Sequence, residues 1–362
     1  MERVSYKKYH KNYPIWKICA DCLGEKKPPS IHSSVKGKEE KLSMSKSLKE
    51  TNVMLKSKRD FKGNLKRALA GWQLYVLLIP ALIWLAVFAY YPMYGLIIAF
   101  KDFKPRVGII DSPWATPLFK HFQTFFSTSI AMTAIKNTVI ISLESLVIAF
   151  PIPIIFALLL NQITRNGPRK AIQTISYAPY FMSNVVVVSI ITVLFSANGL
   201  VNNLIRGTGG HEILFTSSAE WFRTLFIGSN IWQTMGFNAI IFIAALIGIS
   251  PDYYEAAIID GASRFQRILY IDIPLILPTI ILMFILTVGN IMNVGYEKAF
   301  LMQNGTNTVV SELISTYVYK VGLKSAQYSF ATAVGLFNAL VNFAILLVAN
   351  FISKKTSDIS IF

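Results

Sequence analysis

The chain has 362 residues, of which 53% are hydrophobic and 13% aromatic, and its formal net charge is +16. Charged residues make up only 15% of the sequence, against about a quarter in a typical soluble domain. This composition excludes an intrinsically disordered chain and argues against an ordinary soluble enzyme, and two cysteines are too few for a disulfide-stapled secreted scaffold. It is typical of a membrane protein whose basic residues are confined to particular segments.

Residues 1–72 form a basic N-terminal segment with 18 Lys and Arg residues against seven Asp and Glu residues. Because these charges are interspersed with Pro, Ser and Gly, the segment cannot bury a hydrophobic core, and we predict a disordered tail. Attraction to the anionic inner leaflet is favoured over nucleic-acid binding, since the tail precedes a membrane anchor. Cys19 and Cys22 have C-x-x-C spacing, but a zinc site needs four ligands and only His10 and His32 are nearby, so no metal site is predicted.

Six apolar runs follow the tail, each close to the length of about 20 residues that a helix needs to cross a bilayer core. None has the period-2 alternation of a barrel strand, so the fold class predicted is an all-α integral membrane protein with six transmembrane helices. This domain covers residues 73–353, and residues 354–362 form a short tail. The six runs are 74–91, 138–160, 172–195, 225–249, 275–293 and 330–352.

The distribution of Lys and Arg among the loops predicts the orientation of these helices, because cytoplasmic loops carry the excess of positive charge. One side holds residues 1–72, the loops Arg165–Lys170 and Arg264–Arg267, and the C-terminal pair Lys354–Lys355; these segments contain 25 of the 35 basic residues. The alternate loops contain nine. Both termini are therefore predicted to be cytoplasmic in a multi-pass membrane protein.

No sequence signature of catalysis occurs in the chain. It has no G-x-x-x-x-G-K-[ST] loop to hold ATP phosphates, no H-E-x-x-H zinc motif and no G-x-S-x-G nucleophile elbow. The chain is predicted not to be an enzyme and to use no cofactor.

The loop between the fourth and fifth apolar runs has well-defined helix start and stop signals. Ser250 is a good N-cap and Pro251 suits the first helical position, so a helix is predicted to begin there. Gly261 can adopt the left-handed conformation that ends a helix, and Ser263 with Gln266 forms a capping box that begins another. The sequence predicts a compact helix–turn–helix at the cytoplasmic surface, with a small apolar face that suits a groove on a partner.

This loop, residues 250–274, resembles the EAA loop of ABC importer permeases, whose pattern is E-A-A-x3-G-x9-I-x-L-P. The matching residues are Glu255-Ala256-Ala257, Gly261 and Ile271-Asp272-Ile273-Pro274, and Ile273 stands where Leu is usual. Trp232–Gly236 is similar to the fourth helix of sugar-importer permeases. Three further segments are similar to the polysaccharide or multiple-sugar branch of these permeases: Tyr91–Phe103, Tyr177–Phe181 and Gln327–Ala333. The resemblance covers roughly residues 70–355 and leaves out the N-terminal tail.

The resemblance implies the type I ABC importer permease fold and the import of sugars, among them oligosaccharides derived from polysaccharides. It implies a heterodimer with a second homologous permease, two ABC ATPase subunits that hydrolyse ATP, and an extracytoplasmic sugar-binding protein. In this family the EAA helix docks in a cleft of the ATPase. The residues to which the resemblance assigns this coupling are Glu255, Ala256, Ala257, Asp260, Gly261 and Pro274.

Polar side chains inside the apolar runs are candidates for a substrate path, because they are costly in a membrane and face either a cavity or another helix. Amides can hydrogen bond sugar hydroxyls as donor and acceptor, and aromatic faces can stack on sugar rings. For any single Asn, interhelical hydrogen bonding is the favoured role. The candidates are Glu144, Asn184, Trp232, Gln233, Asn238, Asn290, Asn293 and Asn338.

Glu144 is the only acid well inside an apolar run. It can pair with a basic group of the partner permease, contact substrate, or lie protonated against a neighbouring helix, and a structural partner is slightly favoured. The alternative to an ABC importer is an ATP-independent secondary transporter of six helices, which should show internal repeats or broken midplane helices.

Overall fold

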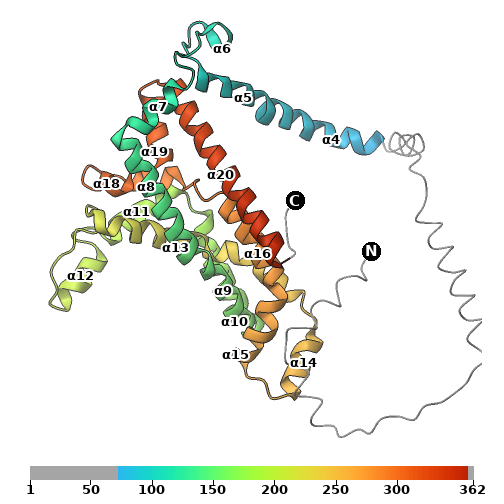
Figure 1. Ribbon diagram of the computed structural model, residues 1–362. Coiled ribbons are helices and arrows are strands. Elements are labelled where there is room, and N and C mark those ends of the chain that lie inside the picture. The colour runs from blue at the N-terminus through green and yellow to red at the C-terminus, as the bar shows by residue number, and fades with distance from the viewer. Residues whose placement is uncertain (1–71, 358–362) are drawn as a thin grey trace, which may run out of the picture. The chain divides into compact units, whose positions relative to one another are not determined.

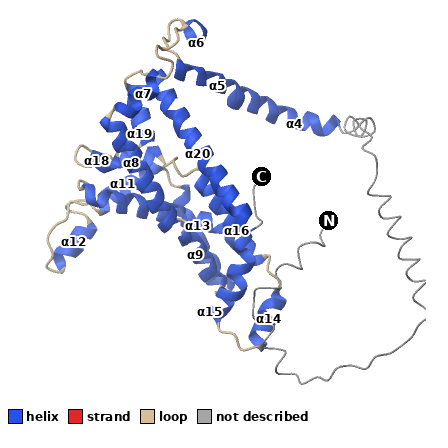
Figure 2. Cartoon of the chain, viewed as in Figure 1, coloured by secondary structure: helices blue, strands red, loops and turns tan. Residues whose placement is uncertain are grey.

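The computed structural model describes residues 72–357, and these residues are almost entirely helical (Figures 1 and 2). Within this range the β-contacts reduce to one isolated antiparallel bridge between Lys101 and Trp114. The chain divides into two units, Met1–Ile83 and Trp84–Phe362. The first helices are α4 (Trp72–Leu85), η2 (Ala86–Tyr90), α5 (Tyr91–Met93), η3 (Tyr94–Phe100), α6 (Gly108–Asp111), α7 (Lys120–Ser127), α8 (Ser129–Glu144), η4 (Ser145–Ala149), α9 (Pro151–Asn161), α10 (Asn166–Tyr177), η5 (Ala178–Phe181) and α11 (Asn184–Leu194).

The C-terminal half of the described chain continues the helical pattern without a strand. Its helices are α12 (Leu200–Gly207), α13 (Ala219–Ile247), α14 (Pro251–Ile259), α15 (Arg264–Arg267), η6 (Ile268–Asp272), α16 (Ile273–Gly289), α17 (Tyr296–Met302), α18 (Thr308–Ser311), α19 (Ile314–Val318), η7 (Tyr319–Lys324) and α20 (Tyr328–Ser357). The η elements are short π-helical or 3₁₀ segments, several of which connect two α-helices into one longer helical stretch.

The prediction of an all-helical membrane protein is confirmed. Five continuous helical stretches of the described chain are long and apolar enough to cross a bilayer: Tyr75–Phe100, Ser129–Asn161, Ala219–Ile247, Arg264–Gly289 and Tyr328–Lys355. Each overlaps one of the predicted runs. The ends differ because a hydropathy scan stops at charged residues such as Lys136 and Asp272, whereas the helices continue through them.

The third predicted run, residues 172–195, is not one straight helix. It is divided into Asn166–Phe181 and Asn184–Leu194, which meet at an angle of 102°. Met182 has an extended backbone, and the Ser183 hydroxyl accepts a hydrogen bond from the amide of Val186 and so begins the second part. A serine in this position competes with helix continuation by capping a new helix instead, an effect that hydropathy does not register.

Packing in the second unit centres on α13, which lies beside α9 (Figure 1). A buried cluster joins α9, α13 and α16 through Leu158, Phe242 and Ile276. Gly236 lets α13 approach α10 closely, since a Cβ atom at this position would lie 2.9 Å from the Cβ of Ser176. Small residues at helix crossings are characteristic of membrane bundles, where close backbone approach replaces the hydrophobic driving force.

The predictions made for residues 1–71 and 358–362 lie outside the described residues. They include the disordered basic tail and the absence of a metal site at Cys19 and Cys22. Within the described range, 72–357, no group of three or more His, Cys, Asp or Glu side chains is arranged to hold a metal ion.

Candidate functional site

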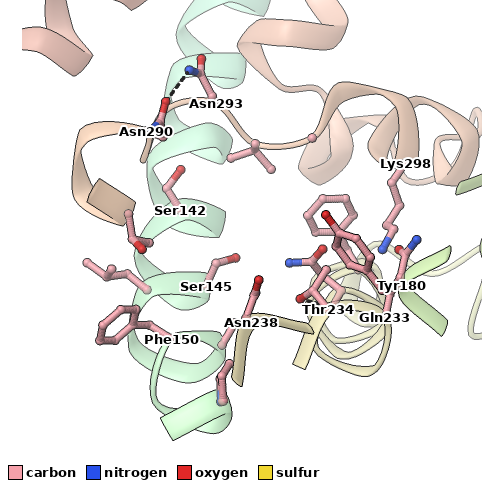
Figure 3. Close-up of a pocket in the computed structure, with 18 of the residues that line it drawn as sticks. Ser142, Ser145, Phe150, Tyr180, Gln233, Thr234, Asn238, Asn290, Asn293 and Lys298 are labelled. Atoms are coloured by element: carbon pink, nitrogen blue, oxygen red, sulfur yellow. Dashed lines mark hydrogen bonds between the residues drawn. The ribbon is translucent and has the colours of Figure 1, made fainter. Parts of the chain in front are cut away.

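The second unit contains a cavity of about 720 Å³ with many amide and hydroxyl side chains in its wall (Figure 3). Small-molecule sites in proteins typically measure about 300–1,000 Å³, so the cavity has the size of a ligand site. Its wall comes from α8 and η4, the bend before α11, α13, α16 and the segment that leads into α17. The polar side chains of the wall are Ser142, Ser145, Tyr180, Ser183, Asn184, Asn230, Gln233, Thr234, Asn238, Thr287, Asn290, Asn293, Glu297 and Lys298.

Helix α13 presents four of these side chains at helical spacings of three and four residues, which place them on one face: Asn230, Gln233, Thr234 and Asn238. Gln233 is buried, and its Nε2 donates a hydrogen bond of 3.1 Å to the backbone carbonyl of Met182. This bond fixes the bend of the third predicted run against α13. The bend therefore helps to form the cavity wall.

The C-terminal end of α16 supplies a second group of amides. The helix ends at Gly289, and the Asn290 side chain donates to the backbone carbonyl of Leu286 at 3.3 Å. Asn293 Nδ2 donates to Asn290 Oδ1 at 3.5 Å, the dashed contact in Figure 3. Asn338 of α20 donates to Asn293 Oδ1 at 3.1 Å but does not line this cavity. The three amides thus form a chain that begins at the cavity and ends in the neighbouring helix.

Two charged residues of the wall, Glu297 and Lys298, were not among the predicted candidates. Glu297 accepts a hydrogen bond of 2.6 Å from Asn184 Nδ2. Lys298 is 4% exposed, and its Nζ has no hydrogen-bonding partner among residues 72–357. Burial lowers the pKa of Lys298 to about 8. The sequence signal for these two residues was a pair of adjacent opposite charges between the fifth and sixth apolar runs. Lys298 entered the prediction only as one of the basic loop residues that indicate the orientation of the helices.

Five of the eight predicted path residues line the cavity: Asn184, Gln233, Asn238, Asn290 and Asn293. Trp232 does not, and its side chain is 45% exposed. Glu144 also lies outside the cavity wall, and its Oε1 is 3.6 Å from Arg223 Nη1. The basic partner of Glu144 is thus in its own chain, on α13. Arg223 therefore accounts for the presence of Glu144 inside an apolar run without a basic group from another permease.

Other intramembrane amides have structural roles. Asn137 is buried and donates to the backbone carbonyls of Val309 and Glu312 at 2.8 and 3.1 Å. Asn342 accepts from the amide of Met292 at 3.0 Å. The bonds of Asn137 connect α8 to the chain around α18, and the bond of Asn342 connects α20 to the turn after α16. Polar contacts of this kind between helices are expected in a membrane bundle.

Aromatic rings also contribute to the cavity region. Tyr180 lines the cavity and stacks on Phe237 of α13, with ring centroids 3.7 Å apart and an interplanar angle of 4°. Phe237 does not itself line the cavity, so Tyr180, backed on one face by Phe237, provides the flat aromatic surface next to the amides. A surface of this kind can pack against the apolar face of a sugar ring.

Loop 250–274 forms the helix pair that its capping signals predict. The Ser250 hydroxyl accepts from the amide of Asp252, and α14 begins at Pro251. Gly261 has φ +74° and follows the end of α14. Ser263 and Gln266 form a reciprocal capping box at the start of α15. All of these bonds are local in sequence, which explains why residue types alone predicted them.

Most of the residues that the resemblance assigns to coupling are exposed on this loop: Glu255, Ala256, Asp260, Gly261 and Pro274 are exposed and Ala257 is half-buried. The apolar side chains Ile258 and Ile259 are also exposed, at 57% and 86%. An exposed short helix with unburied apolar side chains has the form of a docking element for a groove.

One contact connects α14 to the transmembrane helices. The Tyr254 hydroxyl donates to Asp272 Oδ1 at 2.5 Å, and Gln162 Nε2 donates to Asp272 Oδ2 at 3.2 Å. Asp272 is fully buried. Burial and the hydrogen bond to Asp272 raise the pKa of Tyr254, so the tyrosine keeps its proton and remains a donor at physiological pH. This network, which we call the Asp272 network, joins α14, the end of α9 and the start of α16.

Residues 149–358 match the family described as binding-protein-dependent transport system inner membrane component. Protein LplB of Bacillus subtilis is 41% identical, with 80% of this chain aligned to 91% of that protein. The polygalacturonan/rhamnogalacturonan transport system permease protein YteP of the same species is 40% identical, with 80% of this chain aligned to 90% of that protein.

Two solved structures have a similar fold. One is a bacterial ABC transporter involved in the import of the acidic polysaccharide alginate; its matching chain is 40% identical, with a TM-score of 0.74 over 81% of this chain and 99% of that one. The other is a bacterial alginate ABC transporter in complex with an alginate pentasaccharide-bound periplasmic protein, with 39% identity and a TM-score of 0.75 over 84% and 100% of the two chains.

Proposed function

The chain belongs to the family of binding-protein-dependent transport system inner membrane components, and we propose on that premise that it imports oligosaccharides derived from polysaccharides. The observation that carries this proposal is the cavity, in which amides, hydroxyls and an aromatic surface surround about 720 Å³. Sugars offer many hydroxyl groups that both donate and accept hydrogen bonds, and amide side chains match them in both senses.

The proposed substrate path runs through the cavity. Asn184, Gln233, Asn238, Asn290 and Asn293 contribute polar groups to its wall, and Tyr180, backed by Phe237, is the stacking surface. Asn338 does not contact the cavity but orients Asn293 through its hydrogen bond to that side chain. Trp232 and Glu144 lie outside the cavity wall, and Glu144 serves as an ion-pair partner of Arg223.

The energy for transport comes from other subunits on this proposal, since the chain has no phosphate-binding loop. Its partners are a second homologous permease, two ABC ATPase subunits and an extracytoplasmic sugar-binding protein. Helix α14 docks in a groove of one ATPase, with Glu255, Ala256, Ala257, Asp260 and Gly261 at or beside the contact. Pro274, at the start of α16, begins the transmembrane part of the coupling element.

The relatives support an ABC system over the ATP-independent secondary transporter. The broken helix at Phe181–Asn184 is a feature that such a transporter would also show. The family match and the two ABC transporter structures, which cover four fifths of the chain at about 40% identity, favour the importer.

The proposed location is the bacterial cell membrane, with both chain termini in the cytoplasm. The excess of Lys and Arg on one side of the helices supports this orientation, and it places loop 250–274 on the side where ATP is available.

The proposal is tested with the complete importer in proteoliposomes, by measuring oligosaccharide uptake and ATP hydrolysis together. Glu255→Lys and Gly261→Asp should each abolish uptake and substrate-stimulated ATP hydrolysis, while the permease still inserts into the membrane. Glu212→Lys, a charge reversal at a partly exposed glutamate outside α14, is the control and should behave as wild type. Wild-type uptake and hydrolysis in both α14 variants would show that α14 is not the coupling helix.

A further inference from the structure

The cavity contains one ammonium group that no described residue satisfies. Lys298 lies in the wall with a side chain that is 4% exposed, and its Nζ is closed off from solvent without a hydrogen-bonding partner. Figure 3 shows this side chain extending from its helix toward the labelled side chains of Tyr180, Gln233 and Thr234. Burying an ammonium without a partner is costly, so such a group in a ligand-sized cavity indicates a missing anion.

The neighbouring acid does not supply that anion. Glu297 also lines the cavity, but its carboxylate accepts from Asn184 at 2.6 Å, and no ion pair within 4.0 Å joins it to Lys298 in the described chain. Tyr180 is the third titratable side chain of the wall, and it is occupied in stacking on Phe237. Lys298 is therefore the one basic group of the wall, and the rest of the polar lining is neutral except for Glu297.

We propose that Lys298 binds the carboxylate of a uronic acid unit, so that the substrates of this permease are acidic oligosaccharides. The inference rests on the proposed importer function and names the substrate class that its cavity selects. The neutral amides and hydroxyls of the wall hold the ring hydroxyls, while Lys298 recognises the charge. Its four rotatable side-chain bonds let the ammonium turn from its closed position into the cavity.

Burial supports this assignment. It lowers the pKa of Lys298 to about 8, which means that the unliganded cavity penalises the charged ammonium. A carboxylate bound next to it removes that penalty, because an opposite charge at short distance favours the charged form. A neutral sugar offers no such compensation. The same residue thus favours acidic over neutral substrates of equal size.

The experiment uses the complete importer in proteoliposomes and two probes of equal length, trigalacturonate and its carboxyl-reduced counterpart. The variant is Lys298→Met, which keeps most of the side-chain volume and removes the charge. Lys104→Met, at an exposed lysine outside the cavity wall, is the matched control. The binding protein is the same in every preparation, so a change between variants in the acidic-to-neutral uptake ratio reports on the permease.

A hydrogen bond to a charged group contributes a factor of about 10 to 100 in affinity. Lys298→Met should therefore lower the ratio of acidic to neutral kcat/KM by about 10-fold or more. Lys298→Arg, which retains a cation, should keep much of the wild-type ratio, and Lys104→Met all of it.

Three results would overturn the inference and leave the importer function standing. The first is an unchanged ratio in Lys298→Met. The second is a wild-type complex that imports the neutral probe alone. The third is loss of the second permease from Lys298→Met on purification, because the anion would then belong to a subunit contact. A wild type that imports neither probe under ATP would contradict the proposed function itself.

Discussion

Replacing Gly236 by alanine should force α13 and α10 apart. A Cβ atom at this position would lie 2.5 Å from the carbonyl carbon of Ser176, with the carbonyl oxygen closer still. Ordinary van der Waals contact begins near 3.4 Å, so the helices must separate by about 1 Å or more to clear both atoms of this carbonyl group. The obstacle is backbone, which cannot rotate away as a side chain can. Overpacking of this kind costs about 1–3 kcal/mol, and we expect Gly236→Ala to lower the free energy of unfolding by that amount.

The matched control lies on the same helix. A Cβ atom at Gly228 would meet no atom within 4 Å, so Gly228→Ala adds a methyl group without a clash. Alanine favours a helix over glycine by about 1 kcal/mol or less, and the control should be neutral or slightly stabilising. The assay is unfolding of the purified permease in detergent, with folded fraction against denaturant for both variants.

Uptake gives a second measurement for the same pair of variants. Gln233 lies less than one turn from Gly236 and is bonded to Met182, so separating the helices should weaken this bond and raise the KM for oligosaccharide. Gly228→Ala should leave KM unchanged. If Gly236→Ala and Gly228→Ala unfold at the same denaturant concentration, the close approach of α13 to α10 is refuted.

Two further predictions concern polar contacts. Tyr254→Phe removes one donor from the buried carboxyl group of Asp272 and should destabilise the permease by about 1–3 kcal/mol, measured by unfolding in detergent. Tyr253→Phe, at an exposed neighbour on α14, should have no effect, and equal values for the two variants would contradict the network. Glu144→Gln should leave oligosaccharide uptake unchanged, and its coupling energy with Arg223→Gln should be about 1 kcal/mol or less, since both side chains are partly exposed. A loss of uptake in Glu144→Gln without a loss of stability would show that Glu144 contributes to the substrate path.

The parts of the structure that the sequence predicted well are governed by local chemistry. The Ser250 cap, the Ser263–Gln266 capping box and the end of α14 before Gly261 each depend on residues within about one turn of one another. Long apolar runs predict helices equally well, because in a membrane the backbone polar groups of a helix must be hydrogen bonded within that helix. Residue types at fixed spacings carry enough information for both.

The cavity depended on contacts that the sequence does not encode locally. Gln233 lies on α13 and Asn290 directly follows α16, and only the packing of α13 against α16 brings them to one wall. Trp232 is next to Gln233 in sequence but points elsewhere, since adjacent residues of a helix face different directions. Lys298 was missed because α17 is too short for a hydropathy scan, and its charge was read as part of a loop.

The Asp272 network and the cavity lie at opposite ends of the same helix. Asp272 immediately precedes α16, whose 17 residues span about 25 Å. The other end of α16 stops at Gly289, where Asn290 and Asn293 enter the cavity wall. If the ATPase that we propose to dock on α14 displaces this helix, the bond from Tyr254 to Asp272 transmits that displacement to the base of α16. Helix α16 then moves the amides at its far end, so docking on α14 can change the shape of the cavity without any contact between the two sites.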